Sequence, residues 1–206
     1  MMYQGNHYNK LEPYHKNTGN IKEIDNTINH LESLIKEIEE SGILEAIQKL
    51  GPDMLGAYFL KDSRVELYWL SIGLCSILYD YPVEYFTMVV LMHELIHGYT
   101  HIGFDKDGNS WDTLSFDNAD LRIVEGFAEY YSELICLDYF DFALPAFYAL
   151  HEKASEEYTA YKEWFSSTEK DKYEKARRLL LTCRSNNIIN YDHFMHELDK
   201  VRIGNS

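Results

Sequence analysis

The run His93-Glu94-Leu95-Ile96-His97 places two imidazoles and a carboxylate inside a strongly apolar stretch of the chain. Residues four apart lie on one face of an α-helix, so both rings can point at one ion with Glu94 beside them. Apolar residues occupy nearly all the remaining helical positions: Val89, Val90, Leu91, Met92, Leu95 and Ile96. A helix that is apolar all round is buried, so the two histidines are predicted to lie inside the protein, where they need polar partners.

A second acidic cluster, Glu125-Gly126-Phe127-Ala128-Glu129, follows on the next predicted helix. The small residues beside Glu125 allow this helix to approach the first closely, so Glu125 is the preferred third ligand of a metal held by His93 and His97. Glu129 lies one turn later on the same face. Its carboxylate can accept the outer N–H of a ligating histidine and so fix the tautomer of that ring.

These residue types suit hydrolytic zinc chemistry. Such a site has about three protein ligands and one open position, where zinc lowers the pKa of water towards about 7. Zn²⁺ held by His93, His97 and Glu125 would leave Glu94 to act as general base. The sequence therefore predicts a zinc metallopeptidase that acts on a peptide or protein.

Two other sources for the third ligand fit less well. A histidine three residues beyond a glycine, in the pattern H-E-x-x-H-x-x-G-x-x-H, is excluded because Thr100 and Gly103 occupy those positions. His101 continues the row of His93 and His97, but another helical turn adds about 6 Å of rise, too far for a straight helix to share one ion.

The two motifs resemble those of the gluzincin metallopeptidases, in which H-E-x-x-H is followed on a separate helix by a glutamate, often within E-G-x-A. The resemblance covers about Glu84 to Tyr131. It implies a zincin-like core, with His93, His97 and Glu125 as zinc ligands, Glu94 as the base and Glu129 as the acid one turn beyond the third ligand. Nothing between Gly51 and Gly73 matches the G-x-M-E-N segment of the aminopeptidase branch, so an endopeptidase is expected.

The fold class predicted is α+β and predominantly helical. Residues 1–20 form a polar, flexible arm, and residues 21–206 form a single zincin-like domain. An amphipathic helix over about residues 21–40 supplies packing surface, and a shorter helical segment covers 43–50. A β-hairpin over 57–60 and 65–69, and a short helix over 71–79, precede the site helices at about 82–100 and 119–137. Residues 102–118 form a loop, and the C-terminal part, 143–206, is helical, including one helix from Phe147 to Phe165.

Charge and cysteine content indicate which partners and which cellular compartment to expect. A net charge of −15, from 34 acidic and 19 basic residues, repels phosphate backbones, so no nucleic acid partner is expected. No signal peptide or apolar run long enough to span a membrane is visible. The odd number of widely separated cysteines, Cys75, Cys136 and Cys183, argues against a disulfide framework. A soluble, cytoplasmic protein is expected.

Two other function classes stay open at this point. One is a catalytically silent binding or regulatory protein that keeps a structural metal, although such a site has no use for Glu94. The other is a helical interaction protein without metal. A tyrosine or histidine is also expected to stabilise the oxyanion. Four residues are candidates for this role: Tyr158, Tyr191, His151 and His193.

Overall fold

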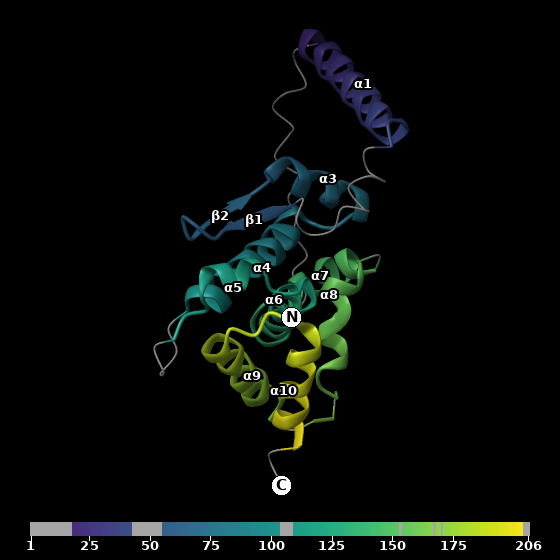
Figure 1. The fold of residues 1–206 in the computed structure, drawn as a ribbon. Helices are drawn as coiled ribbons and strands as arrows, with labels where there is room; N and C mark the ends of the chain where they lie inside the picture. The colour runs from purple at the N-terminus through teal and green to yellow at the C-terminus, as the bar shows by residue number, and fades with distance from the viewer. Residues whose placement is uncertain are drawn as a thin grey trace. The chain divides into compact units, whose positions relative to one another are not determined.

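The computed structural model describes residues 18–42, 55–103, 109–152, 154–166, 168–169 and 171–203. The chain divides into two compact units, residues 1–44 and 45–206. In the first unit, α1 (Thr18–Glu40) is a long helix (Figure 1). The predicted arm, residues 1–20, lies outside the described residues except for its last three, which begin α1, and the predicted helical segment 43–50 also lies outside them.

Helix α1 confirms the helix predicted from the amphipathic periodicity. Ile24, Ile28 and Leu34 belong to its apolar stripe, and all three are exposed. The helix belongs to the unit of residues 1–44, and the single domain from residue 21 onwards stays a prediction. Periodicity reports which face of a helix is apolar, but it does not report which part of the chain covers that face.

The second unit begins with a β-hairpin and continues as helices. Its elements are β1 (Gly56–Phe59), β2 (Arg64–Leu67), α3 (Trp69–Tyr79), α4 (Val83–Ile102), α5 (Thr113–Asp117), α6 (Leu121–Tyr139), η4 (Asp141–Ala143), α7 (Leu144–His151), α8 (Glu156–Thr159), η5 (Ala160–Glu163), α9 (Lys172–Asn186) and α10 (Tyr191–Ile203). The predominantly helical α+β class is thus confirmed. None of the helices in the described ranges is long and apolar enough to cross a membrane.

The hairpin is antiparallel, with Gly56 opposite Leu67 and Phe59 opposite Arg64. It packs against α4. Gly56 is required there, because a Cβ atom at this position would lie 2.8 Å from Cγ1 of Val90 on α4. The missing side chain therefore lets the backbone of β1 approach the motif helix closely.

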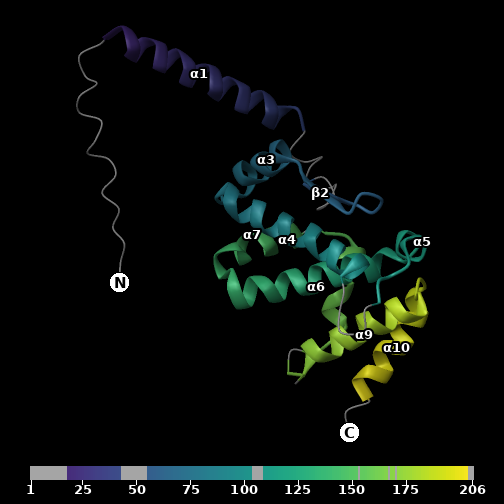
Figure 2. The same cartoon turned by 90° about the vertical axis from the view of Figure 1, so that its left-hand side faces the viewer.

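Helices α4 and α6 lie side by side (Figure 2) and make the most extensive contact between elements of this unit. Aromatic residues such as Phe86 on α4 and Phe127 on α6 are fully buried in the surrounding core. Trp164 packs directly on Gly126 of α6, where an added Cβ atom would lie only 2.4 Å from its Cζ2 atom. The small residue in the second motif thus accommodates an indole ring from the C-terminal part, and not α4 as the sequence predicted.

The C-terminal end of α4 is capped from a distant part of the chain. The guanidinium of Arg184, on α9, donates hydrogen bonds to the carbonyl oxygens of Tyr99 and Thr100, the latter at 3.0 Å. Carbonyls in the last helical turn lack partners within the helix, and a cation there is favourable to the helix dipole. Arg184 is buried, so this long-range cap anchors the helix that carries the motif.

Two of the local predictions are wrong in detail. The single helix expected from Phe147 to Phe165 is divided into α7, α8 and η5. Ser155 adopts an extended conformation at the N-cap of α8, with two acidic residues in the following turn, so a helix start interrupts the apolar periodicity. The predicted loop 102–118 contains the short helix α5, which Asp112 caps by accepting a hydrogen bond from the backbone N–H of Ser115.

The packing of Gly126 predicts the outcome of a matched pair of substitutions. Gly126→Ala is expected to destabilise the protein by roughly 1–3 kcal/mol, because the new methyl group overpacks the buried Trp164 ring. Gly73→Ala, on α3, meets nothing within 4 Å, and it is expected to stabilise by roughly 0.5–1 kcal/mol through helix propensity. Urea unfolding of the two variants measures both effects, and an increase in stability for Gly126→Ala would contradict the packing described.

Candidate metal centre

Three buried side chains converge between α4 and α6. The Nε2 atoms of His93 and His97 lie 2.9 Å apart. Oε2 of Glu125 lies 3.2 Å from the first of these nitrogens and 3.4 Å from the second. The structure therefore brings together the three residues that the sequence predicts as ligands, two from one turn of α4 and one from α6.

The spacing of these atoms fits a metal ion. In a tetrahedral site with zinc–ligand bonds of about 2.0–2.1 Å, the ligand atoms lie about 3.3 Å from one another. The three separations observed here, 2.9, 3.2 and 3.4 Å, are close to that value. A group of two imidazole nitrogens and one carboxylate oxygen is also a usual donor set for catalytic zinc.

Glu129 contacts the outer side of His93. Its Oε1 atom lies 3.2 Å from Nδ1 of His93, and its Oε2 atom lies 2.8 Å from Nε2 of His151 on α7. This is the place predicted for Glu129. Because a carboxylate accepts hydrogen bonds, it favours the His93 tautomer with a proton on Nδ1, which leaves the lone pair of Nε2 directed towards Glu125 and His97.

Burial and charge oppose each other in this cluster. Burial alone would raise the pKa of Glu125, but the rings of His97 and His93 together lower it well below its ordinary value. The pKa of Glu129 is lowered in the same way, against burial, by His93 and His151. Burial lowers the pKa of His93, but Glu129 and Glu125 together raise it well above the ordinary value. The two buried carboxylates are thus ionised, with the histidine rings as their partners, and a divalent cation held by the same rings would offset the carboxylate charge.

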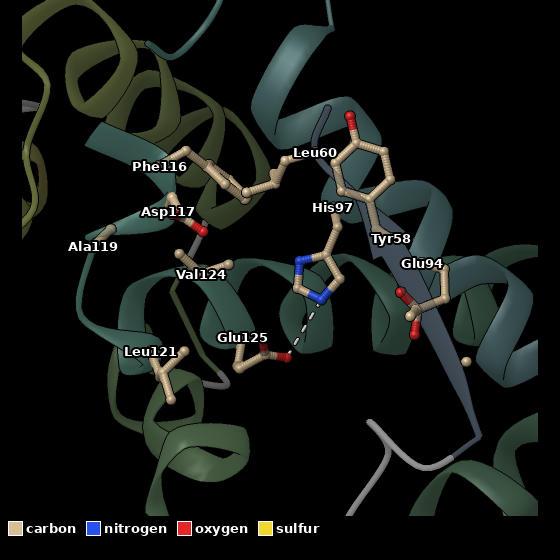
Figure 3. Close-up of a pocket in the computed structure, with 12 residues that line it drawn as sticks. Tyr58, Leu60, Glu94, His97, Phe116, Asp117, Ala119, Leu121, Val124 and Glu125 are labelled. Atoms are coloured by element: carbon tan, nitrogen blue, oxygen red, sulfur yellow. Dashed lines mark ion pairs between the residues drawn. The ribbon is translucent and has the colours of Figure 1, made fainter. Parts of the chain in front are cut away.

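The cluster opens into a cleft of about 280 Å³. Figure 3 shows His97 and Glu125 pointing towards each other at one side of the cleft, with Glu94 on the same helix as His97. The strand β1 forms another wall, through Gly56, Ala57 and Tyr58, and the remaining lining is mostly apolar: Leu60, Phe116, Ala119, Leu121 and Val124. His97, Glu125 and Glu94 therefore face the same cleft.

The position of Glu94 depends on Gly56. A Cβ atom on Gly56 would lie 3.0 Å from both Cγ and Oε1 of Glu94, so the backbone of β1 lies directly against this side chain. Glu94 is almost fully buried in spite of facing the cleft. The hairpin thus restricts the rotamers of the predicted base as well as forming a wall of the cleft.

His101 has a different role from the ligand histidines. Its Nδ1 atom lies 3.0 Å from the hydroxyl of Tyr58, and its Nε2 atom lies 3.0 Å from Oγ1 of Thr113. Both nitrogens therefore have partners away from the cluster. His101 connects the hairpin to α5, and it holds the tyrosine that lines the cleft.

The four candidates for stabilising the oxyanion lie at different distances from the ligand cluster. Tyr158 is buried, with its ring centroid 6.4 Å from that of His93, whereas His151 contacts Glu129. Tyr191 packs against the Arg122 guanidinium, whose Cζ atom lies 4.0 Å from the ring centroid, and Nε2 of His193 lies 3.7 Å from Oε1 of Glu197 on α10. Of the four, Tyr158 is the one whose ring lies beside that of His93.

Sequence reasoning missed two contributors to this site. The contact of His151 with Glu129 joins residues far apart in the chain, and no local motif includes both. Tyr58 was part of a predicted strand, but its place in the cleft depends on the packing of the hairpin against α4. The one available signal for His151 was a histidine in an otherwise apolar segment, which requires a polar partner if buried.

No protein-family model, curated protein or solved structure matches this chain. The chemistry of the clustered side chains and their geometry therefore carry the functional conclusion.

The lowered pKa of Glu129 predicts how the metal-free protein responds to acid. A carboxyl whose pKa is lower in the folded state contributes stability above its ordinary value of 4.5 and loses it as the pH falls through the lower, folded value. Glu129→Gln should therefore make the free energy of unfolding less dependent on pH between about pH 6 and pH 3. Urea unfolding in the presence of a chelator measures this dependence.

The control for this experiment is Glu163→Gln, at an exposed position, which should keep the dependence of the wild type. An identical pH dependence in Glu129→Gln and the wild type would show that His93 and His151 do not lower the pKa of Glu129.

Proposed function

We propose that this protein is a zinc-dependent metallopeptidase with a zincin-like, gluzincin-type centre, and that it acts as an endopeptidase. The observation that carries the proposal is the convergence of His93, His97 and Glu125 at ligand-to-ligand distances, at one side of a cleft that Glu94 also lines. A purely structural metal has no need of an adjacent carboxylate or of an open cleft.

Each residue has a distinct part in the proposed reaction. His93, His97 and Glu125 would hold the ion, which supplies Lewis-acid polarisation of the scissile carbonyl and acidification of water. Glu94 accepts a proton from the attacking water and delivers it to the departing nitrogen. Glu129 keeps the proton of His93 on Nδ1, so that Nε2 remains available as a ligand.

The walls of the cleft support an extended peptide as substrate. The strand β1 pairs only with β2 among the described strands, so its other edge is paired with no described strand. Because Gly56, Ala57 and Tyr58 on β1 line the cleft, a substrate could add to this edge as a further strand. The apolar residues Phe116 and Val124 would contact the side chains of such a peptide.

Zinc binding is the first test of the proposal. The purified protein should bind one equivalent of zinc, and Glu125→Ala should weaken binding by more than the roughly 10–100-fold typical of losing an outer partner of a ligand. His101→Gln is the matched control, because His101 lies one turn beyond His97 on α4 but has its partners elsewhere. Metal analysis and chelator competition give the stoichiometry and the affinities, and equal zinc affinities in Glu125→Ala and wild type would exclude the ligand set.

Glu94→Gln tests the chemistry. The variant should keep its zinc and lose roughly 10²–10⁴-fold in turnover of a peptide library, because the amide cannot accept the proton. Glu84→Gln, at an exposed position on the same helix, should keep wild-type turnover. Equal cleavage by Glu94→Gln and wild type would rule out Glu94 as base. A protein that binds zinc but cleaves no peptide would instead support the binding or regulatory class.

A further inference from the structure

His151 forms a buried link between α7 and the candidate metal centre. Its Nδ1 atom donates a hydrogen bond to the carbonyl oxygen of Phe147, at 2.7 Å. Its Nε2 atom lies 2.8 Å from Oε2 of Glu129. Both of these oxygens are acceptors, so each ring nitrogen of His151 faces a hydrogen-bond acceptor.

The ring of His151 is itself held in one orientation. The Phe147 ring packs against it, with centroids 4.2 Å apart and planes inclined by 33°. Together with the Phe147 carbonyl, this contact leaves the His151 ring little freedom to turn. The side chains of His151 and Glu129 are only 3% and 2% exposed, so water does not substitute for either partner.

Glu129 needs a second anchor to orient its carboxylate. The terminal torsion of a glutamate has no sharp rotamer preference, so a single contact through Oε1 to Nδ1 of His93 does not fix the carboxylate plane. The contact through Oε2 to His151 supplies a second point, on the opposite oxygen. The imidazole of His151 also gives the buried carboxylate a second polar partner at 2.8 Å, which offsets part of the cost of burying it.

We propose that His151 is a positioning residue of the metal centre, which acts through Glu129 to hold the ring of His93 in the tautomer and orientation that a metal ion requires. The inference rests on the proposed function, because it concerns the same metal. The helix α7 supplies no metal ligand, but through His151 it supports the residues that do. The ion bound there is a divalent cation such as zinc.

Two isosteric substitutions separate the two contacts of the ring. His151→Gln keeps a donor near the position of Nε2 and thus the contact with Glu129, whereas His151→Asn keeps a donor near Nδ1 and thus only the bond to Phe147. We expect His151→Asn to weaken zinc binding by roughly tenfold and His151→Gln to stay within a few-fold of the wild type. Chelator competition on the full chain gives the zinc dissociation constants, and the absorption spectrum of the cobalt-loaded protein reports changes in ligand geometry.

A double variant tests whether His151 acts through Glu129. Adding His151→Asn to Glu129→Gln should cause no further loss of zinc affinity, because the intermediate carboxylate is already absent. A merely structural role would lower the affinity again. Unfolding of the metal-free variants, followed by circular dichroism, shows which of them remain folded.

A measurement on the wild type decides the matter if the substitutions prevent folding. Long-range proton–nitrogen spectra of the zinc-loaded protein should show a proton on Nε2 of His151 and on Nδ1 of His93. A His151 ring without a proton on Nε2, or a folded His151→Asn with wild-type zinc affinity and cobalt spectrum, would overturn the inference. Failure of the wild type to bind zinc would instead refute the proposed function, so the two failures are distinguishable.

Discussion

The close approach of α4 to α6 is the constraint on which the site depends, because it buries His93, His97, Glu125 and Glu129 together. None of these groups is tolerated alone in a protein interior. Each has at least one oppositely polarised neighbour between 2.8 and 3.4 Å away. The surrounding structure serves this arrangement: Gly126 accommodates Trp164, Arg184 caps α4, and the hairpin packs against Glu94. The polar cluster is thus enclosed by an aromatic core that leaves one side open to the cleft.

The elements that carry the site were predictable from local sequence. The helices expected at about 82–100 and 119–137 are observed at Val83–Ile102 and Leu121–Tyr139. The hairpin expected over 57–60 and 65–69 is observed at Gly56–Phe59 and Arg64–Leu67. Local patterns were sufficient because an i, i+4 pair on an apolar helix specifies its own geometry. The small residue beside Glu125 was expected to admit α4, but Gly126 admits the Trp164 ring instead. The pairing of His93 with His97 therefore follows from local sequence, whereas the approach of Glu125 depends on the packing of α6 against α4.

The remaining features depend on contacts between residues far apart in the chain. The link from Glu129 to His151, the Arg184 cap and the hydrogen bond of His101 to Tyr58 have no local signature. The helix predicted from Phe147 to Phe165 failed for a related reason, since Ser155 starts a new helix within a continuous apolar periodicity. In α1, the exposed stripe of Ile24, Ile28 and Leu34 shows that amphipathicity predicts a face but not its partner.

The central claim is that two imidazoles of α4 and one carboxylate of α6 bind a single zinc ion. The most direct measurement is X-ray absorption at the zinc edge of the loaded protein in solution. The account predicts two nitrogen ligands at about 2.0–2.1 Å with the outer-ring scattering of imidazole, and oxygen ligands at about 2.0–2.2 Å. A spectrum with sulfur ligands, or with oxygen ligands alone and no imidazole scattering, would contradict it.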